Sequence, residues 1–342
     1  MQSDSFDPRR RPAYRQLAPL ESAKPNNDKQ NDLARGWRCT HLLQAHTSWV
    51  RSVAVSPNGR WIASGSGDKT VRIWSLSSGK LRQVLVGHEG WVRAIAFSPD
   101  GTTLASVSND QTVRFFDSLT GEQKAVMSGH TDFIRCVTFS PDGRLLFTGG
   151  QDNTVKIWQV ETGQLLKTLA VQSHWVRAIA ITPDGKTLMT GSQDGTSQLY
   201  ALRQGGFQHV LRAHQAAVLS VALSPNGWLA ASASADDSIV FWKVNSGRLI
   251  TRFRAHAQPI NSVRFSPDGR LLATASSDKT VRLWHIDSGK LIAVLSGHEG
   301  WVWSVAFAPD SRTIVSGGWN GQVRVWTKDI EPRLSSPKPD KC

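Results

Sequence analysis

The chain has 342 residues, a formal net charge of +13 and three cysteines. Three cysteines without a CxxC pair are too few for a disulfide framework, and they form no metal-ligand pattern. No apolar run resembles a signal peptide, and no stretch approaches the ~20 apolar residues of a membrane span. A cytoplasmic protein with no membrane span is therefore expected, and its positive charge favours anionic partners.

Both ends of the chain lack hydrophobic periodicity. Residues 1–36 contain four prolines and an arginine cluster, Arg9, Arg10, Arg11 and Arg15. This composition predicts a disordered, basic, Pro-containing arm, and the charged residues 329–342 predict a flexible tail. The arginine cluster has two interpretations, a solvated arm or a contact with phosphate or an acidic protein.

The region between these ends repeats one unit seven times. The unit is clearest at residues 87–116, GHEGWVRAIAFSPDGTTLASVSNDQTVRFF. A histidine, glutamine in the fourth copy, recurs every 42 residues, at His46, His88, His130, Gln172, His214, His256 and His298. An aspartate, asparagine in the seventh copy, has the same period, at Asp68, Asp110, Asp152, Asp194, Asp236, Asp278 and Asn320. Stacked units bury a continuous surface, so residues 37–328 are expected to form one domain.

One repeat predicts four short strands. Residues 91–97, 103–108, 112–117 and 123–128 are apolar or β-prone, and turn-forming residues separate them. The first turn, SPDG at 98–101, combines a proline that presets φ with a glycine that accepts positive φ. Four antiparallel strands form one small sheet that cannot bury both of its faces alone. Seven such sheets stacked radially can bury them.

The repeats resemble those of the WD-repeat family, whose members fold as β-propellers. The resemblance covers residues 37–328 and implies an all-β, seven-bladed β-propeller of four-stranded antiparallel blades. The insertion-free, closely similar copies look more like prokaryotic WD proteins, cyanobacterial ones especially, than eukaryotic ones. The family's structural tetrad carries over completely to four copies, as His46, Ser64, Asp68 and Trp74; His130, Thr148, Asp152 and Trp158; His214, Ser232, Asp236 and Trp242; and His256, Thr274, Asp278 and Trp284.

Three copies depart from this tetrad. The second has Phe116 in the aromatic position, and the seventh has Asn320 in place of aspartate. The fourth departs most, with Gln172 and Tyr200. Blade four is therefore expected to be the blade that its tetrad hydrogen bonds stabilise least.

The ring is expected to close through the N-terminal side of the domain. The seventh copy ends at Trp326 without a fourth strand of its own. On the 42-residue grid, residues 38–44 align with 290–296, the fourth strand of the sixth copy. This N-terminal strand should complete the last blade and leave no open joint.

The recurring His, Ser or Thr and Asp sets suggest hydrogen-bonded scaffold rather than catalysis. A catalytic site needs one asymmetric constellation in a pocket, whereas these sets recur once per blade beside a bulky aromatic. Off the grid, His41, His174 and His285 have no metal-ligand partner at a useful spacing. No nucleotide-binding glycine motif occurs in a strand-to-helix context. The sequence therefore predicts a protein that is not an enzyme and needs no cofactor or metal.

Family geometry places two loops of each blade on one rim, and the residues there differ between blades. Aromatic and arginine residues gather in blades seven and one to four, as Trp49, Arg51, Trp91, Arg93, Phe133, Arg135, Trp175, Arg177, Trp301, Trp303 and Trp319. Trp and Arg are enriched in protein-interface hot spots. The alternative is that WVR was copied with the repeat and carries no function. The sequence supports a hypothesis that this rim binds a protein with an acidic segment.

These features favour a non-enzymatic scaffold or adaptor for one or more proteins, with the propeller monomeric outside its complex. Two alternatives stay open. A nucleic-acid-binding propeller would use the basic residues of the opposite rim and the N-terminal arm. A regulatory or sensor subunit would act on an enzyme supplied by another chain.

Overall fold

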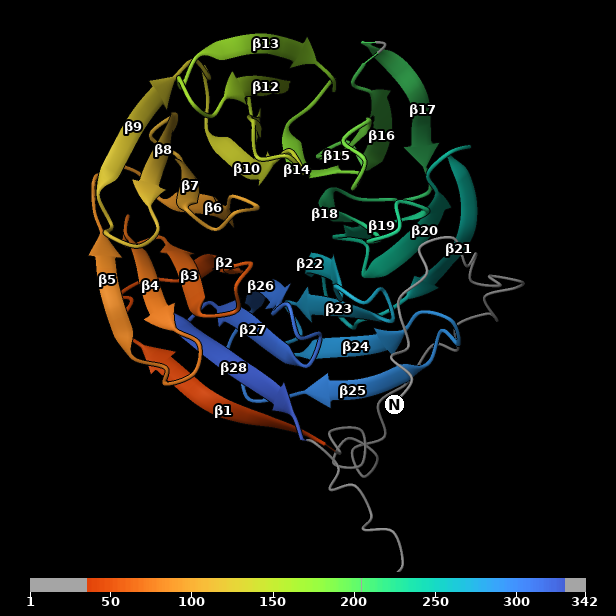
Figure 1. Ribbon diagram of the computed structural model, residues 1–342. Helices are drawn as coiled ribbons and strands as arrows, with labels where there is room; N and C mark the ends of the chain where they lie inside the picture. Colours follow the sequence, from red (N-terminus) through yellow and green to blue (C-terminus); the bar gives the residue numbers. More distant parts are fainter. Residues whose placement is uncertain (1–35, 204, 330–342) are drawn as a thin grey trace, which may run out of the picture.

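The computed structural model describes residues 36–203 and 205–329, and in these residues the chain forms seven four-stranded antiparallel sheets. Figure 1 shows the sheets as blades around a central axis, with the first strand of each blade nearest the axis. The predicted all-β, seven-bladed propeller is confirmed. Nearly all of the predicted arm (1–36) and tail (329–342) lies outside the described residues.

The strands run from the axis outward in each blade. Blade one contains β2 (Val50–Val55), β3 (Trp61–Ser66), β4 (Val71–Ser75) and β5 (Leu81–Leu85). Blade two contains β6 (Val92–Phe97), β7 (Thr103–Ser108), β8 (Thr112–Asp117) and β9 (Gln123–Ser128). Blade three contains β10 (Ile134–Phe139), β11 (Leu145–Gly150), β12 (Thr154–Gln159) and β13 (Leu165–Ala170). Blade four contains β14 (Val176–Ile181), β15 (Thr187–Ser192), β16 (Thr196–Ala201) and β17 (Gly206–Arg212).

The remaining three blades follow the same plan. Blade five contains β18 (Val218–Leu223), β19 (Leu229–Ser234), β20 (Ser238–Lys243) and β21 (Arg248–Arg254). Blade six contains β22 (Ile260–Phe265), β23 (Leu271–Ser276), β24 (Val281–His285) and β25 (Leu291–Leu295). Blade seven contains β26 (Val302–Phe307), β27 (Thr313–Gly318), β28 (Gln322–Lys328) and, outermost, β1 (Trp37–Gln44).

The turn after each innermost strand is built from its own side chains. In blade two, the amide of Gly101 donates to the carbonyl of Ser98 at 2.8 Å, and Gly101 takes a φ of 74°. The Asp100 carboxylate accepts from the amide of Thr102 at 3.0 Å. Glycine tolerates this left-handed backbone without a steric penalty, so the SPDG sequence specifies a tight reversal into the second strand.

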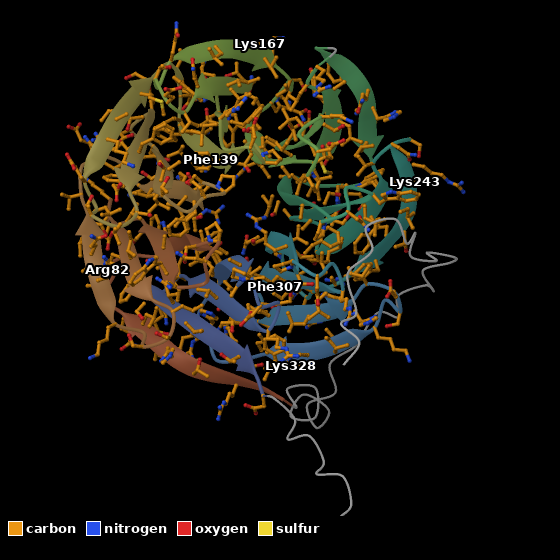
Figure 2. The ribbon with its side chains drawn as sticks, viewed as in Figure 1. Arg82, Phe139, Lys167, Lys243, Phe307 and Lys328 are labelled. Carbon is orange, nitrogen blue, oxygen red and sulfur yellow. The ribbon has the colours of Figure 1, made fainter. Side chains whose placement is uncertain are left out.

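The core lies between blades rather than within them. One buried cluster joins Ala273, Val281 and Leu283 of blade six to Val302 and Ile314 of blade seven. Figure 2 shows Phe139 and Phe307 within the ring, whereas Arg82 and Lys167 lie along its outer edge. Each blade therefore depends on both neighbours to cover its apolar faces, as in other radially repeated sheets.

Strand β1 closes the ring, as predicted. It pairs antiparallel with β28, from Trp37 opposite Lys328 to Gln44 opposite Gln322. Trp37 is buried in the cluster between blades six and seven, and Leu43 is buried in the cluster between blades seven and one. Figure 1 shows β1 and β28 side by side although they come from opposite ends of the domain. One strand therefore fastens three blades together.

No helix in the described part of the chain is long and apolar enough to cross a membrane.

Candidate functional site

The predicted tetrad positions lie within hydrogen-bonding distance of one another in the blades that carry all four residues. In blade one, His46 Nδ1 lies 2.7 Å from Asp68 Oδ2, and His46 Nε2 lies 2.7 Å from Ser64 Oγ. Trp74 Nε1 donates to the same hydroxyl oxygen at 2.8 Å. Burial raises the pKa of Asp68, but hydrogen bonds from His46 and Thr70 outweigh it and hold that pKa well below its usual range. An ionised Asp68 requires a proton on Nδ1, so in neutral His46 the Ser64 hydroxyl donates to Nε2.

This arrangement recurs with little change around the ring. In the other blades that have the histidine, its Nε2 atom lies 2.6–2.8 Å from the hydroxyl oxygen. A buried polar group without a partner costs about 1–3 kcal/mol, and a complete tetrad pairs all of its groups. The sets hold the second and third strands of a blade to the loop before its first strand. They have the properties of scaffold and not of a reaction centre.

Blade four lacks the histidine link. Gln172 Nε2 donates to Thr190 Oγ1 at 2.7 Å, but Asp194 accepts its hydrogen bonds from neighbouring hydroxyl groups instead. The Tyr200 hydroxyl donates to the Ala170 carbonyl at 3.5 Å, so Thr190 gains no second donor from the aromatic position. The loop before β14 is therefore held to the blade by neutral amide and hydroxyl groups and by Ser173, without the histidine that bridges the hydroxyl and the carboxylate in a complete tetrad.

We expect the backbone amides of β15 and β16 to exchange with solvent faster than those of β11 and β12 in blade three, where the tetrad is complete. Native-state hydrogen exchange measured by mass spectrometry checks this, because amide protection reports local opening. Equal protection in blades three and four would contradict it.

Blade seven keeps its histidine but has lost the carboxylate. His298 Nε2 lies 2.7 Å from Ser316 Oγ, whereas the buried His298 Nδ1 has no hydrogen-bond partner. Asn320 stands in the aspartate position and donates to Glu299 at 3.4 Å. Burial first and the charge of Arg324 second lower the pKa of His298 to about 3. His298 therefore stays neutral at physiological pH and lacks the ionised carboxylate that pairs with the histidine of a complete tetrad.

The Asn320→Asp substitution should stabilise the protein by about 1 kcal/mol at neutral pH, because it gives His298 Nδ1 an acceptor. The wild type should also lose stability as the pH falls from ~6.5 toward 3. Across that window His298 is protonated in the unfolded chain and neutral in the folded chain. The free energy of unfolding therefore falls by up to ~1.4 kcal/mol per pH unit. The carboxylate raises the pKa of His298, so the variant should show a shallower slope.

Urea unfolding between pH 4 and pH 7 measures both effects. Asp278→Asn in blade six is the matched reverse change, and it should destabilise the protein because His256 Nδ1 loses its acceptor at 2.8 Å. An Asn320→Asp variant with wild-type stability and slope would refute the interpretation.

The innermost strand of every blade contains a β-bulge at its second residue. In blade one the register passes from Val50 opposite Ser66 to Ser52 opposite Gly65, so Arg51 has no partner in the ladder. The seven residues in this position, here called the bulge residues, are Arg51, Arg93, Arg135, Arg177, Leu219, Asn261 and Trp303. Bulges re-aim side chains and are common beside functional sites. The variable positions of the predicted rim thus share one backbone irregularity.

Neutral amide side chains hold three of the four bulge arginines. Arg93 Nε donates to Asn109 Oδ1 at 2.7 Å, and Arg177 Nε donates to Gln193 Oε1 at 2.6 Å. Arg135 Nη2 donates to Gln151 Oε1 at 2.7 Å. Each amide residue lies 16 residues after its arginine, a spacing that does not by itself predict the contact.

The positive charges of the four arginines repel one another. Burial first and repulsion by the other three second lower the pKa of Arg51 to about 9. Burial, followed by the charge of Arg177, lowers the pKa of Arg93 to about 10. Arg51 and Arg177 lie on the innermost strands of blades three positions apart. We call Arg51, Arg93, Arg135 and Arg177 the arginine arc.

Five tryptophan rings from blades seven, one and two form a second group, here called the Trp cluster: Trp49, Trp91, Trp301, Trp303 and Trp319. Trp49 stacks on Trp319 with ring centroids 5.4 Å apart, and it meets the edge of Trp91 at 4.8 Å. Trp301 contacts both Trp303 and Trp319, at 5.5 and 5.3 Å. Trp319 is 49% exposed and Trp301 is 46% exposed. Monomeric proteins rarely expose a continuous apolar patch of this kind without a partner for it.

Glycines make room for these rings. A Cβ on Gly67 would lie 2.7 Å from the ring of Trp49, and a Cβ on Gly300 would lie 3.0 Å from the Cβ of Trp319. Arg51 joins the Trp cluster to the arginine arc, because its guanidinium carbon lies 4.1 Å from the centre of the Trp303 ring. The two groups therefore form one surface.

The structure does not bring all the predicted rim residues together. In the described part of the chain, Phe133 makes no ring contact with the Trp cluster. Trp175 lies apart from it and contacts Arg135 and Arg177, whose guanidinium carbons are 5.3 and 5.4 Å from its ring centre. The predicted rim thus divides into the Trp cluster over blades seven, one and two, and the arginine arc over blades one to four.

Comparison with known proteins finds relatives that match over short regions. Pre-mRNA-splicing factor prp46 of Emericella nidulans is 49% identical over 49 residues, 14% of this chain and 11% of that protein. Pre-mRNA-splicing factor PRP46 of Kluyveromyces lactis is 32% identical over 74 residues, 21% of this chain and 17% of that protein. Pleiotropic regulator 1 of Homo sapiens is 44% identical over 46 residues, 14% of this chain and 9% of that protein. The chain thus spans less than a fifth of the length of these relatives.

Two expectations from the sequence need correction. The expected cytoplasmic location is contradicted, because relatives are named as pre-mRNA-splicing factors and pre-mRNA splicing takes place in the nucleus. The expected prokaryotic, cyanobacterial resemblance is not supported, because these relatives are fungal and mammalian proteins. Closely similar, insertion-free repeats describe the regularity of a ring and carry no reliable signal of its origin.

The repeats themselves match one family description along most of the chain. The description is "WD domain, G-beta repeat", and it matches residues 37–75, 79–117, 121–159, 163–200, 205–243, 247–285 and 289–327. Each match ends at or next to the last residue of the third strand of a blade, which agrees with the observed sheets. The chain therefore belongs to the WD domain, G-beta repeat family.

Proposed function

We propose that this protein is a non-enzymatic interaction scaffold that docks a protein partner through the Trp cluster and the arginine arc. The observation that carries the proposal is the contact of five tryptophan side chains at one rim of the propeller. They lie beside four arginines that form no ion pair with a carboxylate among the described residues. Tryptophan and arginine are the residues that dominate binding energy in protein interfaces. The relatives named as pre-mRNA-splicing factors support a protein-binding role within a complex.

The chemistry of the surface favours a partner segment that is both apolar and acidic. The Trp cluster offers flat rings with exposed edges, and the arginine arc offers guanidinium groups that bind carboxylates in a bidentate manner. Because Arg51 touches Trp303, a single short segment can contact both groups. This arrangement supports an extended peptide with an aromatic or aliphatic residue near an acidic one.

The nucleic-acid alternative is not favoured. Nucleic-acid binding by a propeller would need basic residues with interleaved aromatics for base stacking. The basic turn residues on which this alternative depends are placed by the sequence on the opposite rim, where Trp228 is the one aromatic among them, so that rim lacks rings for base stacking. The regulatory-subunit alternative would use the same docking surface.

The test is a peptide selection on the full chain. A randomised peptide library displayed on phage is selected against the protein, and the dissociation constants of enriched peptides are measured by fluorescence anisotropy. We expect acidic peptides with one large apolar residue. Trp49→Ala and Trp319→Ala should each weaken binding about 30-fold or more, the loss typical of a hot-spot residue.

Trp228→Ala is the matched control, because Trp228 is also exposed but follows the turn after an innermost strand and so emerges at the opposite edge. It should leave peptide binding unchanged. Enriched peptides that bind all three variants equally would discard the surface. Tight binding of single-stranded RNA that weakens steeply between ~50 and ~200 mM salt would support the nucleic-acid alternative instead.

A further inference from the structure

In blade six the tetrad carboxylate is surrounded by three hydrogen-bond donors. Asp278 Oδ2 lies 2.8 Å from His256 Nδ1, and it accepts from the amide of Ala257 at 3.4 Å. Arg282 Nη2, from the third strand of the blade, lies 3.5 Å from the same oxygen. Blade one repeats this arrangement around Asp68, with an imidazole, an amide and a guanidinium group. The three donors of such a corner together suit one carboxylate.

Blade seven keeps the three donors but has no carboxylate in the aspartate position. His298 is 5% exposed, and its Nδ1 atom has no hydrogen-bond partner. The amide of Glu299 and the guanidinium group of Arg324 take the sequence positions of the other two donors. We call these three groups the blade-seven corner. Every other tetrad histidine has an aspartate beside its Nδ1 atom, and buried polar groups without a partner are few in folded proteins.

Arg324 lies beside the loop that carries His298. Gly297 packs against the guanidinium group, because a Cβ on this glycine would lie 3.1 Å from Arg324 Nη1. The hydrogen bonds of Arg324 in the described part of the chain are long, 3.9 Å to Cys39 Sγ and 3.4 Å to Gln322 Oε1. A positive charge and an imidazole donor thus adjoin the same loop. A carboxylate complements both of them.

The blade-seven corner adjoins the Trp cluster. A Cβ on Gly318 would lie 2.7 Å from His298 Nδ1 and 3.3 Å from the carbonyl oxygen of Trp301. Trp319 follows Gly318 in the chain, and its ring centre lies 5.3 Å from that of Trp301. A segment that places one side chain in the corner can therefore pack its neighbouring residues on exposed tryptophan rings.

Asn320, in the aspartate position, is held weakly. It donates to the Glu299 carboxylate at 3.4 Å and accepts from the Gln322 amide at 3.4 Å, and both distances are long for hydrogen bonds. Its side chain can therefore turn aside for a carboxylate from another molecule. The neighbouring Glu299 does not prevent this, because blade two has Glu89 in the same loop position and its amide still donates to the Asp110 carboxylate at 3.0 Å.

We propose that the blade-seven corner binds the carboxylate of an aspartate or glutamate in the partner segment that the Trp cluster docks. This inference rests on the proposed function and refines it, because it names a binding position for an acidic residue that is separate from the arginine arc. The incoming carboxylate supplies the acceptor that His298 Nδ1 lacks, and it pairs with the charge of Arg324. Hydrogen bonds to an ionised acceptor are stronger than neutral ones, so one acidic residue fixes the register of the docked segment.

The test starts from a peptide selected on the full chain and from variants in which each acidic residue in turn is replaced by its amide. Wild-type protein should bind one amide variant about tenfold more weakly than the parent peptide. Asn320→Asp supplies a carboxylate from the chain itself. It should bind the parent peptide about tenfold more weakly than the wild type does, and it should bind that amide variant as the wild type does.

Two further substitutions separate the corner from its surroundings. Asn320→Ala supplies no carboxylate, so it should bind the parent peptide as tightly as the wild type does. Arg324→Gln should weaken the parent peptide and leave the amide variant unaffected. Arg114→Gln is the matched control, because Arg114 has the same position in blade two, where Asp110 already lies 2.7 Å from His88 Nδ1. It should preserve the affinity for both peptides, and circular dichroism melting confirms that each variant keeps its ring.

Three results would overturn the inference. Equal losses of affinity in Asn320→Asp and Asn320→Ala would mean that the Asn320 side chain itself contacts the peptide. An amide variant that is weakened equally in wild type and Asn320→Asp would place the acidic residue elsewhere. Glu299→Gln that lowers stability in urea unfolding, together with no gain from Asn320→Asp, would show that the chain fills the corner with its own Glu299 carboxylate.

The two proposals fail in distinguishable ways. If Trp49→Ala and Trp319→Ala weaken the peptide while Asn320→Asp does not, the docking surface stands and the carboxylate position in blade seven falls. If neither tryptophan variant affects any peptide, the proposed function itself falls.

Discussion

A chain that lacks residues 1–45, and with them β1, is expected to lose the cooperative unfolding transition of the intact ring. The truncation leaves the outer edge of β28 unpaired and removes Trp37 and Leu43 from two different interblade clusters. Loss of a buried tryptophan costs about 3–5 kcal/mol and loss of a buried leucine about 2–5 kcal/mol. Together these approach the ~5–15 kcal/mol total stability of a typical domain.

Thermal denaturation followed by circular dichroism measures the effect. The matched control is a chain that lacks only residues 1–36. The control keeps all of β1 and should melt like the full-length protein. A synthetic peptide of residues 36–45, added to the shorter chain, should restore part of the transition by occupying the open edge of β28. Identical melting of the two truncated chains would show that β1 does not fasten the ring.

The second large effect is expected from Thr148→Val in blade three. The Thr148 hydroxyl lies 2.7 Å from His130 Nε2 and accepts from Trp158 Nε1 at 2.8 Å. Valine has the same shape and no hydroxyl, so two buried nitrogen atoms lose their partner at once. Each unpaired group costs about 1–3 kcal/mol, and we expect a total loss of about 2–6 kcal/mol in urea unfolding.

Blade four supplies the matched control for this substitution. Thr190 receives a hydrogen bond from Gln172 alone, because Tyr200 bonds elsewhere. Thr190→Val should therefore cost about half as much as Thr148→Val. Equal losses at the two positions would mean that the hydroxyl contributes through packing and not through its place in the tetrad.

The fold was predictable from the sequence because one signal repeats seven times. Each copy alone presents four short strands that also suit a sandwich or a small barrel. The constant 42-residue spacing from His46 to His298 removes that ambiguity, since it requires equivalent units. The closing strand was predictable for the same reason. Residues 38–44 match a strand position on the grid that the last copy leaves empty.

The candidate docking surface was predictable only in part. Its residues stood out by composition, but their grouping depends on closure of the ring. Trp49 and Trp319 lie near opposite ends of the domain, and they stack only because β1 joins blade seven and brings blade one beside it. The amide partners of the arginines could not be predicted. They lie in the turn between the second and third strands of a blade, and their contact with the first strand depends on the bulge. A bulge changes register by one residue, and hydrophobic alternation in a six-residue strand does not reveal it.

The bulge residues have a consequence for how such a protein can change. A residue with no partner in the ladder can be replaced without breaking a strand pair or a tetrad. The ring already holds four kinds of residue there, represented by Arg51, Leu219, Asn261 and Trp303. Under the proposed function, the seven positions, one per blade, are the ones at which the docking surface can vary. A new specificity can be assembled blade by blade while the architecture underneath stays the same.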